Sequence, residues 1–168
     1  MNLPRKFRLV VAVCLASLAR VPAEITAANL RKAAPAFTQN DSAGAPLRLS
    51  DYKGKVVLLN FWATWCHGCK LEIPWFMEFE SRLKDSGLAV IGVSMDDDGW
   101  KSVKPYLELK KLNYPVVIGN QALAKQYGLA SMPMTVLIDR NGKIAALHTG
   151  VVDKAACEGE IQQLLKGK

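Results

Sequence analysis

The chain has 168 residues, of which 50% are hydrophobic and 22% are charged, so it is too apolar for a disordered protein and has the length of one domain with a short extension. Its four cysteines are too few for a small disulfide-scaffolded protein. The net charge of +7 falls to about +4 without the first thirty residues, and so mild a charge argues against nucleic acid as a partner.

Residues 1–23 have the pattern of a signal peptide or membrane anchor. A basic start is followed by an uncharged apolar run, and small residues at Ala19 and Ala23 each end a cleavage pattern. A helix that begins the domain is the alternative, and the basic start argues against it. Lipidation of Cys14 is disfavoured because Val13 precedes it, where a lipobox usually has Gly, Ala or Ser. We therefore expect an exported protein, free in the periplasm or tethered on the extracytoplasmic side of the membrane.

Residues 24–34 are interpreted as a linker, and residues 35–168 as a single α/β domain. In chain order, strands are expected at 36–38, 47–49, 56–62, 88–95, 116–119, 135–139 and 143–149. Helices are expected at 66–84, 100–111, 121–127 and 153–165. This alternation of strands and helices predicts a mixed sheet between two helical layers.

Local patterns support the central elements. The run VVLLNFW at 56–62 is nearly all apolar, as in a strand buried on both faces. In the helix after it, Pro74 is expected to cause a kink. Asn141-Gly142 is a strong hairpin-turn signal between the last two strands. The residues expected on one buried stripe of the first helix recur every four positions: Leu71, Trp75, Phe79 and Leu83.

The sequence Trp65-Cys66-His67-Gly68-Cys69 follows a predicted buried strand and begins a predicted helix. Near the first turn of a helix, unpaired backbone N–H groups and the helix dipole stabilise an anion, here a thiolate at Cys66. That thiolate can attack a partner's disulfide. Cys69, one turn further on the same face, can then attack Cys66 and release the reduced partner. The same steps in reverse oxidise a dithiol.

Other uses of this cysteine pair are less well supported. A c-type haem attachment needs a His directly after the second cysteine, where this chain has Lys70. A purely structural disulfide would close a very short loop and stabilise little. A zinc site needs four ligands. The remaining Cys and His residues are not spaced as a second pair: Cys14, Cys157, His67 and His148.

Several stretches resemble the thioredoxin superfamily, and in particular its exported TlpA/ResA branch of thiol–disulfide oxidoreductases. They are GKVVLLNFWATWC at 54–66, IGVSMD at 91–96, MPMT at 132–135 and LIDRNG at 137–142, together with PAF at 35–37 and LSDYKG at 49–54. The resemblance covers about residues 35–166. It implies a thioredoxin fold, a mixed β-sheet sandwiched between helices, with an N-terminal β extension.

The resemblance also implies roles for individual residues. Cys66 would be the exposed nucleophile and Cys69 the buried resolving thiol, so their redox-active disulfide would act without a cofactor or metal. Pro133 would be a cis-proline that faces the disulfide and leaves the backbone of Met132 free to pair with a bound substrate segment. Trp65 would shield the disulfide and contact partners, with a core aromatic as the alternative.

Three positions near the cysteines depart from the usual pattern of the superfamily. Gly68 stands where a proline is usual, so the two redox states are expected to differ in local order. An imidazolium at His67 would favour the thiolate and make the protein a stronger oxidant, whereas a solvated helix-start residue would have little effect. Asn60 replaces the buried aspartate of cytoplasmic thioredoxins.

Glu72 matches a glutamate that ResA-like relatives carry three residues after the second cysteine. One helical turn from Cys69, it would tune the pKa of that thiol. A solvated glutamate on the helix surface is the alternative. The remaining polar candidates are given structural interpretations: Asp96, Asp97 and Asp98 as a solvated acidic turn, Cys157 as an unpaired structural cysteine, and His148 as a packing or solvent-facing residue.

We expect a thiol–disulfide oxidoreductase that reduces disulfides of exported proteins, for example apocytochrome c in cytochrome c maturation or a copper-site protein. A membrane thiol donor would supply its electrons. A dithiol oxidase or isomerase is the alternative, and His67 would favour it. A thiol peroxidase is less well supported because redoxin-type peroxidases need a Thr three residues before the reactive cysteine, which neither Cys66 nor Cys69 has. A non-catalytic copper-binding module would use both sulfurs as soft ligands, but their helix-start position suits exchange better.

Overall fold

The computed structural model describes residues 25–167, so the predicted signal or anchor at 1–23 lies outside the described residues. The strands are β1 (Thr38–Asn40), β2 (Pro46–Arg48), β3 (Val56–Trp62), β4 (Leu88–Ser94), β5 (Val116–Ile118), β6 (Met134–Ile138) and β7 (Ile144–Thr149). The α-helices are α1 (His67–Leu83), α2 (Trp100–Lys110), α3 (Gln121–Tyr127) and α4 (Lys154–Lys166), and the 3-10 turns are η1 (Ala28–Leu30), η2 (Leu49–Tyr52) and η3 (Lys84–Ser86). Every predicted strand and helix is present, with ends that differ by at most two residues.

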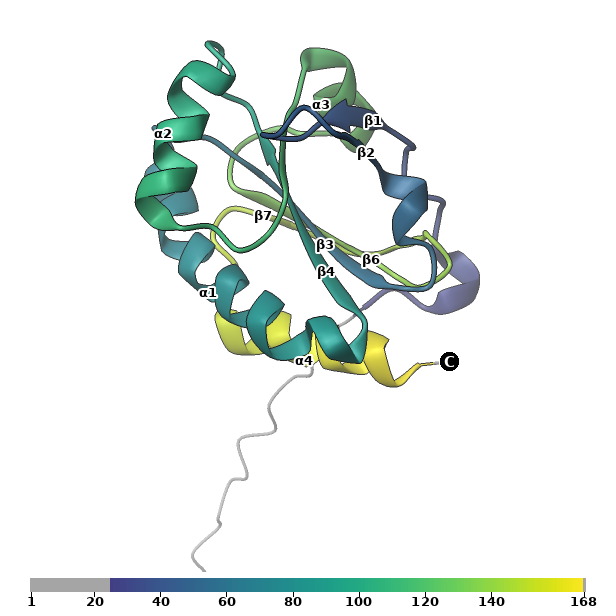
Figure 1. The fold of residues 1–168 in the computed structure, drawn as a ribbon. Helices are drawn as coiled ribbons and strands as arrows, with labels where there is room; N and C mark the ends of the chain where they lie inside the picture. Colours follow the sequence, from purple (N-terminus) through teal and green to yellow (C-terminus); the bar gives the residue numbers. More distant parts are fainter. Residues whose placement is uncertain (1–24, 168) are drawn as a thin grey trace, which may run out of the picture.

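Five strands form one mixed sheet in the order β5-β4-β3-β6-β7, and β1 and β2 form a separate antiparallel pair. β3, β4 and β5 are parallel, whereas β6 and β7 run antiparallel to their neighbours. Helices α1, α2 and α4 pack on one face of the sheet, and α3 and the β1–β2 pair pack on the other (Figure 1). The predicted sandwich is therefore confirmed.

Strand β3 supplies both halves of the core because its side chains alternate between the two faces. Val56, Leu58 and Trp62 belong to the apolar cluster beneath α1, α2 and α4. Val57, Leu59 and Phe61 belong to the cluster beneath α3. All seven residues of β3 are buried, as its continuous apolar sequence predicted.

The buried stripe of α1 differs from the predicted one. Leu71 is 50% exposed and Trp75 only partly buried. Residues spaced by four advance about 40° beyond a full turn at each step, so a run of four such residues leaves the core-facing side. The residues of α1 that face the core lie three or four positions from one another along the helix, with Glu72 and Ile73 adjacent in sequence: Cys69, Glu72, Ile73, Phe76, Phe79 and Leu83. α1 is one continuous helix across Pro74.

The first hairpin begins two residues later than predicted, at Thr38. Its turn is closed by Asp41, whose carboxylate accepts hydrogen bonds from the backbone N–H groups of Ala43 and Ala45, both at 2.9 Å. Strand pairing starts directly outside this turn, which places β1 at Thr38–Asn40.

The segment interpreted as a linker lies along the edge strand β7. Thr26 N donates to Ala145 O and Ile144 N donates to Lys32 O, both at 2.8 Å. Arg31 forms an ion pair of 2.9 Å with Asp139, and both side chains are nearly buried. Residues 25–34 are therefore held against the domain. Within residues 25–167, no helix combines the length and the apolar character needed to cross a membrane.

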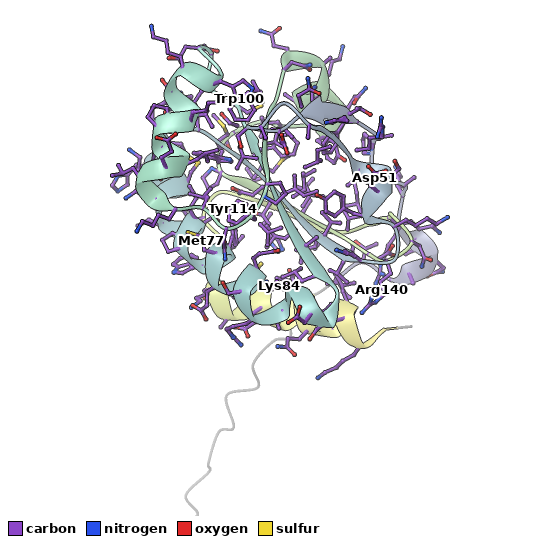
Figure 2. All side chains as sticks on the ribbon, viewed as in Figure 1. Asp51, Met77, Lys84, Trp100, Tyr114 and Arg140 are labelled. Carbon is purple, nitrogen blue, oxygen red and sulfur yellow. A yellow bond between two sulfur atoms is a disulfide. The ribbon has the colours of Figure 1, made fainter. Side chains whose placement is uncertain are left out.

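Arg140, in the turn between β6 and β7, links three segments of the chain at one end of the molecule. Its guanidinium donates to the backbone oxygens of Gly54 (2.8 Å), Ser86 (3.3 Å) and Leu165 (3.1 Å). Arg140 and Lys84 lie in the lower part of the folded domain in Figure 2, and Trp100 lies near its top. Because Trp100 follows β4, this upper end carries the loops at the carboxyl ends of the parallel strands, where ligands bind in open α/β sheets.

Candidate active site

The two cysteines of the Cys-x-x-Cys stretch lie where β3 leads into α1. Cys66 is the N-cap of α1, its Sγ accepts a hydrogen bond from Cys69 N at 3.2 Å, and the two residues form a disulfide. Cys66, expected to be the exposed nucleophile, is buried with only 7% of its surface exposed, and Cys69 is fully buried. An incoming sulfur would therefore meet Cys66 first. The first-turn N–H groups of α1 favour a thiolate at that position, and the arrangement suits thiol–disulfide exchange.

Trp65 projects from the surface beside the disulfide. Its side chain is 64% exposed, so the alternative of a core aromatic is wrong. An exposed tryptophan next to a reactive sulfur offers a large apolar contact to a protein partner.

Gly68 allows the start of α1 to approach Pro133 closely. The Met132–Pro133 peptide bond is cis, and Met132 packs partly buried against the core. A Cβ on Gly68 would lie 3.2 Å from Pro133 Cδ and 2.9 Å from Val151 Cγ2. Pro133 and the connection between β7 and α4 therefore both border the cysteine pair.

Glu72 is fully buried, so the alternative of a solvated surface glutamate is wrong. Its Oε1 accepts a hydrogen bond from Val152 N at 2.6 Å, and its Oε2 lies 3.5 Å from Asn60 Nδ2. Burial raises the pKa of Glu72 to about 7, and the bonds from Val152 and Asn60 and the charge of His148 act in the opposite direction. A carboxyl that titrates near neutrality one turn from Cys69 has the properties of a proton acceptor for that thiol. This role stays a prediction.

Asn60 lies on the face of β3 that α1 covers, next to Glu72. Its Nδ2 donates to Thr135 Oγ1 at 3.2 Å, and within residues 25–167 its Oδ1 has no hydrogen-bond partner. His67, at the first position of α1, is exposed. Both interpretations of His67, as a tuning residue and as a solvated one, stay open.

Asp96 corrects the sequence analysis, which assigned it to a solvated turn with Asp97 and Asp98. Only the latter two are exposed, whereas Asp96 is buried. Its carboxylate accepts hydrogen bonds from the backbone N and the Oγ1 of Thr64 and from Ser94 Oγ. Asp96 thus joins the end of β4 to the loop that carries the cysteines. Its position directly after a buried parallel strand could have indicated a role near the site, because the carboxyl ends of such strands meet at one edge of the sheet.

A second buried acid, Glu160 on α4, was also missed. It is 2% exposed, and its Oε2 lies 2.7 Å from Nε2 of His148 on β7. The hydrogen bond to Glu160 raises the pKa of His148. Nothing in the sequence separates Glu160 from the other acids of α4, so no local pattern could have revealed this pair.

Cys157 is a free and buried thiol. Burial raises its pKa to about 12, so it stays protonated, as expected for a structural cysteine. Within the part of the chain that the structure describes, no three Cys, His, Asp or Glu side chains are grouped so that they would hold a metal ion.

Comparison with known proteins agrees with this geometry. The chain matches the AhpC/TSA family over residues 30–147. It is 35% identical over 142 residues to the thiol-disulfide oxidoreductase ResA of Geobacillus kaustophilus, which covers 84% of this chain and 81% of that protein. It is 33% identical over 130 residues to the thioredoxin-like protein YneN of Bacillus subtilis, which covers 76% of each chain.

A solved structure from Chlorobium tepidum, described as a thiol:disulfide interchange protein DsbE, superimposes with a TM-score of 0.77 at 33% identity. The superposition covers 80% of this chain and 96% of that one. The thioredoxin fold implied by the sequence is therefore confirmed.

Proposed function

The chain belongs to the AhpC/TSA family and is a thiol–disulfide oxidoreductase, and we propose that it uses the dithiol of Cys66 and Cys69 to reduce disulfides of exported proteins. The observation that carries this proposal is the buried carboxyl of Glu72, one helical turn from Cys69. Reductive exchange is completed only when Cys69 loses its proton. A carboxyl with a pKa of about 7 can accept that proton at neutral pH.

In the proposed reaction, the Cys66 thiolate attacks one sulfur of the partner's disulfide. The partner's S–S bond breaks, its second sulfur leaves as a thiolate that takes up a proton, and a Cys66–partner disulfide forms. Cys69 then passes its proton to Glu72 and attacks Cys66 Sγ. The Cys66–partner bond breaks, and the partner sulfur that was bound to Cys66 leaves as a thiolate that takes up a proton. The partner gains two electrons, and the cysteine pair is left as the disulfide.

The cycle then requires a dithiol donor, which we place in the membrane. No cofactor is needed beyond the two sulfurs. Trp65 and the backbone of Met132 are the proposed contacts for the partner, since Trp65 precedes Cys66 and Met132 precedes Pro133, which lies close to Gly68. The signal pattern in residues 1–23 supports an extracytoplasmic location. The substrates would then be exported proteins such as apocytochrome c or a copper-site protein.

The reduction potential of the cysteine couple tests the direction of electron flow. Protein that starts at residue 24 would be equilibrated with glutathione or dithiothreitol buffers, and the dithiol fraction measured by alkylation. A value near or below thioredoxin's, about −270 mV, is expected for a reductant. A value towards about −120 mV would overturn the proposal and indicate a dithiol oxidase or isomerase. In a separate assay, Cys69→Ser should accumulate a mixed disulfide with an oxidised apocytochrome c peptide.

A further inference from the structure

A polar row crosses the sheet on the face that α1 and α4 cover. Asn60 on β3 pairs in register with Thr135 on β6, and Thr135 pairs with His148 on β7. Residues directly opposite one another on antiparallel strands place their side chains on the same face, and Asn60 Nδ2 donates to Thr135 Oγ1 at 3.2 Å. Most other side chains on this face are apolar. The row therefore needs an explanation, because buried polar groups are costly in such surroundings.

The two ends of the row carry ionisable partners. At the inner end, Asn60 Nδ2 lies 3.5 Å from Glu72 Oε2. At the outer end, on the edge strand, the His148 side chain is 30% exposed and Nε2 lies 2.7 Å from Oε2 of Glu160, whose side chain is 2% exposed. This hydrogen bond raises the pKa of His148 and so favours the protonated imidazole. The row thus runs from a buried carboxyl near the disulfide to a histidine at the edge of the sheet whose protonated form is favoured.

A second connection runs through the chain between β7 and α4. The hydrogen bond between His148 and Glu160 joins β7 to α4, the two elements that flank residues 150–153. This connection includes Val152, whose N–H donates to Glu72 Oε1 at 2.6 Å. The ion pair therefore holds in place the backbone donor that fixes the Glu72 carboxyl.

We propose that His148 and Glu160 form a positioning pair for Glu72: Glu160 keeps His148 cationic, and this cation, with the Val152 amide that the pair holds in place, keeps Glu72 able to take the proton of Cys69. The inference rests on the proposed function in one respect, the proton transfer from Cys69 to Glu72. Neither His148 nor Glu160 touches the reacting sulfurs in this scheme, so both act through Glu72.

The electrostatics around Glu72 agree with this arrangement. The bond to Glu160 raises the pKa of His148 although burial opposes it, and the charge of His148 acts to lower the pKa of Glu72. Two other titratable groups interact electrostatically with Glu72: Cys157 on α4 and Tyr114, which precedes β5. Burial raises the pKa of each. Both stay neutral at physiological pH. Among these groups, His148 is therefore the one whose charge, when its imidazole is protonated, lowers the pKa of Glu72.

The proton on Glu72 decides whether the last exchange step can start. Cys69 S–H must pass its proton to an ionised carboxylate before its sulfur attacks Cys66 Sγ and the partner's thiolate leaves with the electron pair of the broken S–S bond. Without a nearby cation, burial alone would keep Glu72 protonated to higher pH. Loss of His148 is therefore expected to move this step to higher pH rather than to abolish it.

The test measures the titration of Glu72 directly by NMR, with glutamate labelled with ¹³C at the side-chain carboxyl and the Glu72 signal assigned from a Glu72→Gln sample. In His148→Gln, the Glu72 midpoint should rise by roughly half to one pH unit, the low end of the effect of a neighbouring opposite charge. Glu160→Gln should give a rise of the same sign. His148→Lys, which keeps the cation, should restore the wild-type midpoint. Glu158→Gln is the matched control, because Glu158 lies on the same helix but binds Arg82 at 2.7 Å.

A second measurement follows the release of a thiol chromophore from a mixed disulfide on Cys66. Its pH profile should shift in His148→Gln by the same amount as the Glu72 midpoint. Midpoints and profiles that coincide with wild type in folded His148→Gln and Glu160→Gln would overturn the inference. If only one of these two variants folds, the other decides. The titration of Glu72 needs no substrate, so it separates this inference from a failure of the proposed reductant role, which the reduction potential reports.

Discussion

Replacing Glu72 by Gln is expected to remove much of the pH dependence of stability around neutrality. Folding buries the carboxyl and raises its pKa from 4.5 to about 7. Between these values the folded protein keeps a proton on Glu72 that the unfolded chain has released, so the free energy of unfolding falls as the pH rises. The shift corresponds to about 3 kcal/mol at about 1.4 kcal/mol per unit. Part of this titration lies below about pH 5, so roughly 2 kcal/mol is expected to remain between about pH 5 and about pH 8.

The assay is urea unfolding of the oxidised protein at pH values from about 5 to about 8, with Glu78→Gln as the matched control. Glu78 lies exposed on the same helix, and its bonds to Lys154 and Arg82 lower its pKa, so its charge does not change in this range. Wild type and Glu78→Gln should each lose about 2 kcal/mol across the range relative to Glu72→Gln. Parallel curves for the three proteins would refute the reasoning from burial.

Other outcomes depend on single side chains. Asp96→Asn turns an amide donor towards the donors of Thr64 and should lower the free energy of unfolding by about 1–3 kcal/mol, and an unchanged urea midpoint would contradict this. Arg31→Ala removes the cation from the buried Asp139 and should cost about 2–3 kcal/mol, again measured by urea unfolding. Cys157, with a pKa of about 12, should resist iodoacetamide in the native reduced protein that starts at residue 24. Mass spectrometry that finds it alkylated as fast as the active pair would show that the thiol is accessible.

Much of the fold could be predicted because its signals are local. The helix at Gln121–Tyr127 has the predicted bounds. It begins after Asn120, whose side chain accepts from Leu123 N, and ends at Gly128, whose φ is 68°, and both are features that short-range rules recognise. The first hairpin was predicted two residues too early because its position depends on hydrogen bonds that short-range rules did not recognise. The bonds from Asp41 to the two backbone amides of its turn decide where the strands begin, and a pattern of apolar residues does not contain them.

The cysteine pair could also be predicted, because its chemistry depends on a spacing of three residues and a helix start. The burial of Glu72 could not. Helical spacing places Glu72 on the face of Cys69, but whether that face is covered depends on Asn60 of β3 and on Val152, which is 80 residues away in sequence. Only the assembled sheet and α4 bring these groups together.

The acids whose burial the sequence did not settle share a physical property. An acidic side chain is rarely buried unless it is paired, so exposure was the right expectation for Asp97 and Asp98 and the wrong one for Asp96, whereas the burial of Glu72 was left open and that of Glu160 was not considered. Each of these three buried acids has a hydrogen-bonding partner from another element of the fold. Two of them, Asp96 and Glu72, lie beside the segment that carries the disulfide, where the proposed dithiol must lose and regain protons. A buried, partly compensated carboxyl is costly for folding, but it provides a proton site near neutral pH. Two of the three acids whose burial local patterns did not predict therefore lie near the cysteine pair, where the proposed chemistry requires a proton acceptor.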